Sequence, residues 1–268
     1  MAAAVLAAGC ATTGDRYGAP EAIGAIHSFK KEYIKTDLSK LTAFCNFTRP
    51  GSKLTVYIEG DGSAWRSRHE LSDDPTPRHQ LMLILATMDP SENVAYLARP
   101  GQLTEERTPD CDSEYWAERR FSREVVNAMN SAIDRLKTES RAKEISLVGF
   151  SGGAAIAVII AAGRSDVASI RTIAGCLDCE AVCKYHNATP LEGSLNPIDF
   201  ADKVSHIPQR HFVGDRDDIV PVFVIESFAG RIGDKTRESV TVVPGASHLY
   251  GWKKAWPSLL ALPLYKKT

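Results

Sequence analysis

Short apolar runs alternate with longer segments of helical periodicity along most of the chain. In the longest helical segment, Tyr115–Lys137, apolar residues recur every three or four positions and charged residues fill the other face. The other predicted helices are Thr76–Met88, the Ala-rich segment from Ser151 to Gly163, Pro221–Ile232 and Trp252–Leu262. The predicted strands are Ile26–Lys35, Leu41–Phe47, Lys53–Glu59, Asn93–Ala98, Ile145–Val148, Ile170–Ala174, Arg210–Val213 and Ser239–Val243.

The order of these elements predicts an α/β fold, a mostly parallel central sheet with helices on both faces. The first two strands, joined by the polar turn Thr36–Lys40, are expected to form an antiparallel hairpin at the sheet edge. Residues 64–77 show no clear element. Gly175–His206 is the only insertion between core strands that could form a cap, and it is short. Within it, His186 could reach a site from above, although a solvated loop histidine is the simpler interpretation.

One stretch, Glu144–Ala162, combines a strand-length apolar run, the sequence Gly-Phe-Ser-Gly-Gly and a segment without a helix breaker. Strand, sharp turn and helix are the context that a G-x-S-x-G motif requires, and they predict that Ser151 is a nucleophile. Gly149 and Gly153 lack the Cβ atoms that would keep the strand and the helix apart. The helix would point its N-terminal N–H groups at chemistry on the serine. The alternative is a purely structural turn.

Four predicted strand ends carry polar or reactive sequence: Glu59–Ser63, Ser151, Asp215–Asp218 and Ser247–His248. In sheets of this kind, active residues collect at the carboxyl ends of the strands. The pattern therefore predicts one site to which all four segments contribute.

The serine, the acidic segment and the histidine follow one another in an order that resembles the α/β-hydrolase superfamily, whose triad runs Ser, Asp or Glu, His. Three local motifs resemble the acid loop, the histidine loop and the oxyanion loop of that superfamily: Gly214–Pro221, Val243–His248 and Tyr57–Ser63. The sequence departs from the superfamily at Glu59, where a histidine is usual. The resemblance covers about residues 50–262.

The resemblance implies that Ser151 attacks an ester-like carbonyl, that His248 takes its proton, and that a carboxylate orients the histidine. Three neighbouring carboxylates are available, Asp215, Asp217 and Asp218. The superfamily's motif places its acid three residues after Gly and three before Val. This spacing selects Asp217.

The resemblance also implies an oxyanion hole made by the backbone N–H groups of Gly152 and Asp61. Losing one such donor typically costs about 3 kcal/mol of transition-state stabilisation. We expect Glu59 to order this loop, paired with Arg99 or Arg66, and the Asp61 side chain to cap a turn. Arg120 is expected to cap or pair within its own helix.

Several short stretches resemble, more narrowly, an uncharacterised group of bacterial α/β-hydrolases, some of them described as lipoproteins. These stretches are Ile58–Gly62, Asp74–Pro77, Leu97–Pro100, Tyr115-Trp116, Arg120-Phe121 and Gly193–Pro197. This narrower resemblance implies no particular substrate.

The N-terminus is small and apolar up to Gly9-Cys10 and polar from there to about Pro20. It resembles the end of a bacterial lipoprotein signal peptide, with Cys10 as the lipidated residue, although no Lys or Arg precedes the apolar stretch. A start codon placed too far downstream would explain the missing basic region. We expect residues 1–24 to be a signal and tether (the tether itself at 11–24) and residues 25–268 to be the hydrolase domain. The expected location is the bacterial cell envelope, lipid-anchored or periplasmic, with the cytoplasm as the alternative.

Composition and motifs limit the classes of partner and cofactor that the sequence predicts. The chain of 268 residues carries a formal net charge of −1, so nothing indicates a nucleic-acid partner. No apolar run has the length of a membrane span. The sequence contains neither a dinucleotide fingerprint nor a P-loop, and we expect no cofactor. The spacing of Cys176, Cys179 and Cys183 is compatible with a metal-binding site. The simpler expectation is that these cysteines form one disulfide or remain buried thiols.

The sequence therefore predicts a serine hydrolase that cleaves an ester-like bond in a small molecule through an acyl-enzyme intermediate. A thioesterase, a lipase or a peptidase would use the same three residues. A non-catalytic envelope binding protein on this scaffold, or a metal-binding envelope protein built on the Cys176–Cys183 cluster, are the alternatives of a different class.

Overall fold

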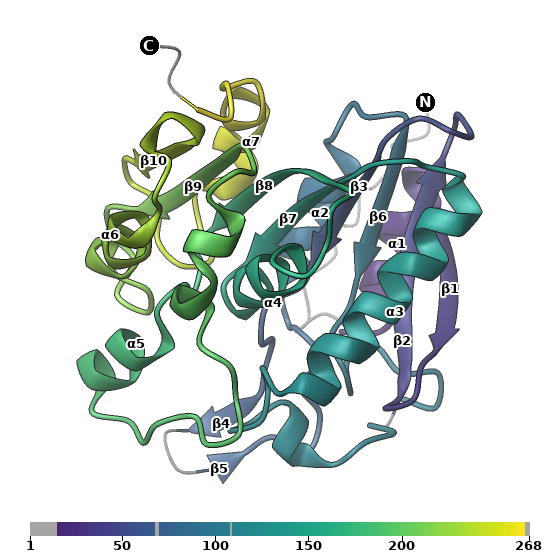
Figure 1. Ribbon diagram of the computed structural model, residues 1–268. Coiled ribbons are helices and arrows are strands. Elements are labelled where there is room, and N and C mark those ends of the chain that lie inside the picture. The colour runs from purple at the N-terminus through teal and green to yellow at the C-terminus, as the bar shows by residue number, and fades with distance from the viewer. Residues whose placement is uncertain (1–14, 68–69, 108, 266–268) are drawn as a thin grey trace, which may run out of the picture.

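The computed structural model describes residues 15–67, 70–107 and 109–265. Its main sheet contains eight strands in the described part of the chain, in the order β1-β2-β6-β3-β7-β8-β9-β10 (Figure 1). The strands are β1 (Lys30–Lys35), β2 (Lys40–Phe47), β3 (Leu54–Ile58), β6 (Asn93–Leu97), β7 (Ile145–Phe150), β8 (Val167–Ile173), β9 (Gln209–Gly214) and β10 (Glu238–Val243). All neighbours from β6 to β10 pair in parallel, whereas β2 is antiparallel to both β1 and β6. The predicted sheet and its antiparallel edge hairpin are confirmed.

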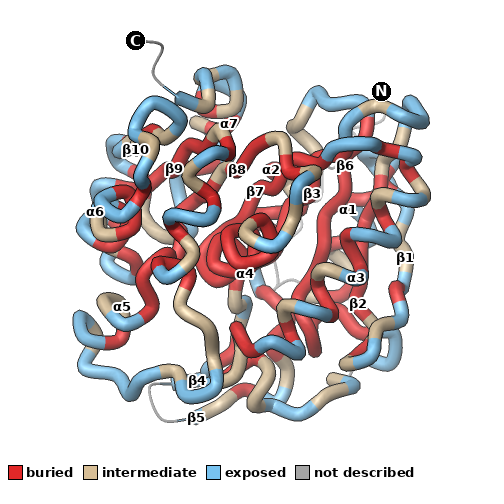
Figure 2. The backbone as a smooth tube through the Cα atoms, viewed as in Figure 1, coloured by how far each residue is buried: buried red, intermediate tan, exposed pale blue. Residues whose placement is uncertain are grey.

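Helices cover both faces of this sheet (Figure 1). One face carries α3 (Arg123–Ser140), α4 (Gly152–Ala161) and α6 (Val222–Arg231), and the other carries α1 (Gly18–Ile26), α2 (Leu81–Thr87) and α7 (Trp252–Leu260). Every residue of α4 and of the central strands β3, β6 and β7 is buried, as Figure 2 shows. Continuous apolar runs are what strands covered on both faces require.

Two predicted helices begin later than expected. The helix predicted from Thr76 begins only at Leu81, because Pro75 and Pro77 lie in a loop that leads into it. The helix predicted from Tyr115 begins at Arg123, where the Ser122 side chain accepts a hydrogen bond from the Val125 N–H and caps the helix. The 3-10 turn Ser113–Tyr115 precedes it.

Residues 64–77 contain a small hairpin that the sequence did not indicate, β4 (Trp65–Ser67) and β5 (Glu70–Leu71). Strands of two and three residues are too short to show an alternating pattern. The excursion Gly175–His206 contains α5 (Cys179–His186) and the 3-10 turns Pro197–Phe200 and Asp202–Val204.

The predicted tether is wrong for the part of it that the structure describes, residues 15–24. Helix α1 packs against the sheet, Tyr17 is only 8% exposed, and Arg16 forms an ion pair with Asp74 at 3.1 Å. The glycines and the proline of α1 hid this helix, because both residue types lower helix propensity. Cys10 lies outside the described residues, so its lipidation stays a prediction. Within the described residues, no helix has both the length and the apolar character needed to cross a membrane.

Candidate active site

Ser151 lies in the sharp turn between β7 and α4, with φ 50° and ψ −118°. A non-glycine residue in this region is strained, and such strain persists where the surrounding structure enforces it. The turn is enforced by close packing: a Cβ atom on Gly149 would lie 2.4 Å from the Gly153 carbonyl oxygen. One on Gly153 would lie 2.4 Å from the carbonyl oxygens of Ile58 and Glu59. The expected strand–turn–helix geometry is confirmed.

The structure brings Ser151, His248 and Asp217 into one hydrogen-bonded chain. His248 Nε2 lies 3.1 Å from Ser151 Oγ, and its Nδ1 lies 2.9 Å from Asp217 Oδ2. The Asp217 side chain is fully buried, whereas that of His248 is 14% exposed. A carboxylate on Nδ1 leaves Nε2 free to accept a proton from the serine hydroxyl.

The acid loop distinguishes the three neighbouring carboxylates. Asp217 Oδ1 accepts hydrogen bonds from the backbone N–H groups of Ile219 at 3.0 Å and Val220 at 2.8 Å, which aim the carboxylate inward. Asp215 instead accepts from the Gly245 N–H at 2.6 Å and braces the neighbouring turn, and Asp218 is exposed. The carboxylate selected by motif spacing is thus the one that contacts the histidine.

The histidine loop is fixed by the tryptophan that begins α7. Trp252 is fully buried, and its indole N–H lies 2.8 Å from the Ser247 carbonyl oxygen and 2.9 Å from that of His248. The Phe150 ring lies 5.1 Å from the imidazole, centroid to centroid. These contacts hold the imidazole over the serine.

The two residues expected to supply oxyanion donors, Gly152 and Asp61, lie against one another. Gly152 is the first residue of α4, so its N–H has no partner inside the helix. Within the described residues, the Asp61 N–H donates no backbone hydrogen bond. A Cβ atom on Gly152 would lie 2.0 Å from Asp61 Oδ1, so the Asp61 loop packs directly on the start of α4.

The Asp61 carboxylate does not cap a turn, because two arginines bind it. Arg99 Nη1 lies 3.3 Å from Oδ1 and Arg120 Nε lies 3.3 Å from Oδ2. The side chain of Arg99 is 3% exposed and that of Arg120 is 17% exposed. Arg120 also donates a hydrogen bond to the Ala117 carbonyl oxygen at 3.2 Å within its own segment, as expected, and its ion pair with Asp61 was not expected. The two guanidinium groups offset the negative charge of this carboxylate at the start of α4.

Glu59 bonds within the loop as expected, but it pairs with neither expected arginine: Arg99 binds Asp61, and Arg66 pairs with Glu70 and Asp73. Glu59 Oε1 accepts a hydrogen bond from the Gly60 N–H at 2.9 Å, and Oε2 accepts one from the Tyr96 hydroxyl at 3.0 Å. The side chain is buried, and burial raises the pKa of this carboxyl to about 7.

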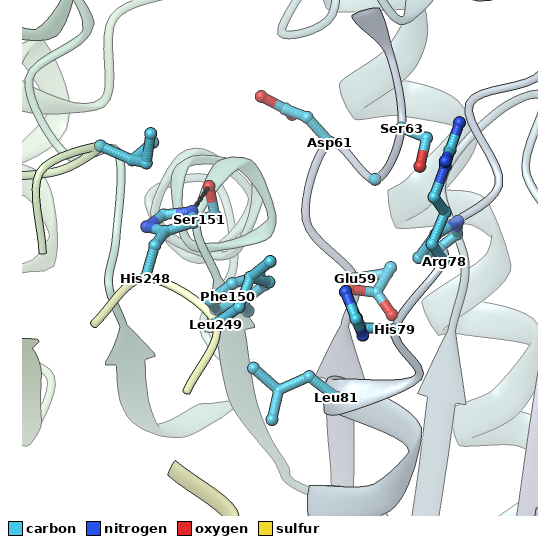
Figure 3. A pocket seen from close by; sticks show the side chains of 13 residues that line it. Glu59, Asp61, Ser63, Arg78, His79, Leu81, Phe150, Ser151, His248 and Leu249 are labelled. Carbon is cyan, nitrogen blue, oxygen red and sulfur yellow. Dashed lines mark hydrogen bonds between the residues drawn. The ribbon is translucent and has the colours of Figure 1, made fainter. Parts of the chain in front are cut away.

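A cavity of about 450 Å³ opens over the serine. Figure 3 shows Ser151 and His248 on one side of it and Arg78 and His79 on the other. Its lining residues are Glu59, Asp61, Gly62, Ser63, Pro77, Arg78, His79, Leu81, Phe150, Ser151, Ile219, His248 and Leu249. The side of the cavity opposite the serine thus carries both carboxylates, Glu59 and Asp61, and the basic residues Arg78 and His79.

The cysteine cluster does not form this site. Cys176 Sγ and Cys179 Sγ lie 3.4 Å apart as free thiols, and the Cys176 hydrogen bond together with burial raises the pKa of Cys179 well above its ordinary value. The described residues contain no group of three or more His, Cys, Asp or Glu arranged to hold a metal ion.

His186 lies on α5, and its Nε2 is 2.8 Å from the Ile219 carbonyl oxygen in the acid loop. It does not line the cavity.

Neither a protein-family model nor a curated protein matches the sequence. Solved structures do match. An alpha-beta serine hydrolase homologue from Coxiella burnetii has 18% identity and a TM-score of 0.56, over 86% of this chain and 93% of that one. An esterase from Pyrococcus furiosus has 15% identity and a TM-score of 0.61, over 88% and 92%. An acylaminoacyl peptidase from Pyrococcus horikoshii has 14% identity and a TM-score of 0.62, over 91% of this chain but 44% of that one.

Proposed function

From the α/β-hydrolase fold of this chain, we propose that it is a serine hydrolase that cleaves an ester-like bond through an acyl-enzyme intermediate. The observation that carries the proposal is the hydrogen-bonded chain from Asp217 through His248 to Ser151 at the carboxyl edge of the sheet. The structural likeness to an esterase and to a serine hydrolase homologue supports the same class.

Each group has a defined part in the proposed reaction. His248 Nε2 removes the Ser151 hydroxyl proton as Oγ attacks the substrate carbonyl, and Asp217 stabilises the imidazolium. The N–H groups of Gly152 and Asp61 bind the tetrahedral oxyanion. His248 then returns the proton to the leaving alkoxide, and a water molecule, activated in the same way, releases the acid.

The first test is covalent labelling with a fluorophosphonate probe, which reacts with activated serines. Wild type is expected to label once, and Ser151→Ala is expected to abolish labelling while the circular dichroism spectrum is unchanged. The matched control is Ser169→Ala, which removes a buried hydroxyl that bonds to Ser146 on the neighbouring strand. Undiminished labelling of Ser151→Ala would overturn the proposal.

A substrate panel separates the members of the class. The panel contains aryl esters graded by acyl length, an aryl thioester and a peptidyl anilide. Each substrate releases a chromophoric leaving group, so its cleavage is followed by absorbance. We expect the short aryl esters to give the highest kcat/KM, because the cavity of about 450 Å³ lies toward the small end of the range for ligand sites. A preference for long acyl chains would indicate a lipase, and one for the anilide a peptidase.

The cell-envelope location is a separate proposal that rests on the N-terminal sequence alone. Mass spectrometry of the protein from its native host would show a diacylglyceryl group on Cys10 if it holds, and an unmodified Met1 if it does not.

A further inference from the structure

We propose that the substrate carries an anionic group, and that Arg78 binds this group on the side of the cavity opposite Ser151. The inference rests on the proposed function and names the substrate class of the same site. It also gives a role to the segment Asp74–Pro77, a motif that the proposed reaction does not use.

Three arginines lie at or near the cavity, and two of them, which do not line it, are already paired. Arg99 and Arg120 both bind the Asp61 carboxylate and lie buried behind the oxyanion loop. Arg78 lines the cavity itself, is exposed to solvent, and has no ion pair or hydrogen bond within the described residues. A guanidinium with five donors and no partner is suited to binding a carboxylate or phosphate.

The backbone that carries Arg78 is held in place before any ligand binds. Asp74 accepts hydrogen bonds from Arg16 and Tyr17, and the Pro75 carbonyl oxygen accepts one from the Ser63 N–H at 2.9 Å. The Thr76 hydroxyl, which is buried, accepts one from the Leu103 N–H at 2.9 Å. These bonds and the two fixed φ angles of Pro75 and Pro77 preorganise the segment, which lowers the entropy cost of binding.

A ring contact between His79 and Tyr250 connects the Arg78 side of the cavity to the histidine loop. Their rings meet edge to face with centroids 5.9 Å apart, so the residue next to Arg78 contacts the histidine loop across the cavity. Figure 3 shows Arg78 and His79 facing the cavity from the side opposite His248.

The other charges at the cavity leave the field of Arg78 uncompensated. The Asp61 carboxylate is neutralised by two arginines. Burial raises the pKa of Glu59 to about 7, so this carboxyl is partly neutral near that pH. Asp217 does not line the cavity and contacts His248. A cavity with excess positive charge raises the local concentration of anionic substrates.

The experiment uses two matched pairs of esters. In the first pair the acidic group is on the acyl side: 4-nitrophenyl hemiglutarate against 4-nitrophenyl valerate. In the second it is on the alcohol side: 4-carboxyphenyl butyrate against the neutral 4-carbamoylphenyl butyrate. The measured quantity is the ratio of kcat/KM, acidic to neutral, for wild type, Arg78→Gln, Arg78→Lys and the charge control Arg231→Gln on α6.

In wild type, we expect a ratio above one in at least one pair, and the pair shows which side of the ester faces Arg78. Arg78→Gln is expected to lower that ratio about 10- to 100-fold, the loss of one charged hydrogen-bonding partner. Arg78→Lys should retain part of the ratio, and Arg231→Gln should retain all of it. Rising ionic strength should lower the wild-type ratio, because an exposed charge is screened.

Two outcomes would overturn the inference: a wild-type ratio at or below one in both pairs, or an unchanged ratio in Arg78→Gln. Either result leaves the proposed function standing if the neutral esters are cleaved and Ser151 is labelled. Failure of the proposed function would look different, as an absence of labelling and of cleavage for every ester.

Discussion

The two sides of the cavity hold their reactive groups in different ways. The histidine side, made by Ser151, His248 and Asp217, uses one carboxylate held by one imidazole and by two N–H groups of its own loop. The arginine side, made by Glu59, Asp61 and Arg78 with Arg99 and Arg120 behind, contains two carboxylates and three guanidinium groups from separate segments.

The difference follows from what each side must do. In the proposed function, the histidine side passes a proton between two atoms, which needs a fixed distance. In our proposal the arginine side binds negative charge that is developing or already present, which needs preorganised donors and cations. Removing a group from the histidine side should therefore affect turnover, and removing one from the arginine side should affect stability, selectivity or oxyanion binding.

The largest expected effect is on the histidine side. Asp217→Asn should lower kcat about 10⁴-fold on any ester that wild type cleaves, as loss of the triad acid does in serine proteases. Asp215→Asn and Asp218→Asn should change kcat by less than about tenfold, because neither carboxylate contacts His248. Steady-state kinetics of the three variants measures these changes in kcat. Near-normal turnover of Asp217→Asn would show that another group orients the histidine.

The second effect lies where the two sides meet. Gly152→Ala would place a methyl group 2.0 Å from Asp61 Oδ1 and displace this carboxylate, which two arginines hold in place, and with it the oxyanion loop that we propose. We expect kcat to fall about 10²- to 10³-fold, as it does when one oxyanion donor is lost. Gly230→Ala, whose added methyl would meet nothing within 4 Å, is the control. Equal kcat values for the two variants would show that the loop can move without cost.

The third prediction concerns Glu59, which should link stability to pH. The pKa of its carboxyl rises from 4.5 to about 7 on folding, so the folded chain keeps a proton that the unfolded chain has lost between these values. The contribution is complete below pH 4.5 and is lost as the pH rises to about 7, a total of about 3 kcal/mol. Urea unfolding at pH 5 and pH 7.5 should show wild type losing about 2 kcal/mol more than Glu59→Gln. Parallel losses in both proteins would contradict the prediction.

The smallest expected effect compares two adjacent arginines. Arg120→Gln removes one of two cations from Asp61 and should lower the free energy of unfolding by about 2 kcal/mol, because Arg99 remains. Arg119→Gln removes partly exposed pairs with Glu114 and Glu124 and a contact with the Tyr115 ring, and should cost less than about 1 kcal/mol. Urea unfolding at one pH measures both. Equal losses would mean that the arginine side is not held by buried charge.

The histidine side was the more predictable of the two. The strand–turn–helix context of Ser151 and the spacing around Asp217 are local features, and the structure shows both as expected. Helix boundaries were less predictable, because the helix expected at Thr76 starts at Leu81 after a loop fixed by distant contacts. Helix α1 was missed because packing against the sheet, and not its own propensity, stabilises it.

The sequence by itself determined the alternation of strands and helices, the turn at Ser151 and the identity of the histidine's carboxylate. These depend on backbone geometry and on neighbours within a few residues. Only the tertiary structure decided that Arg99 and Arg120 meet at Asp61 and that Arg78 faces the cavity. A long, flexible charged side chain can reach many partners, and which one it meets depends on how loops far apart in the chain pack together.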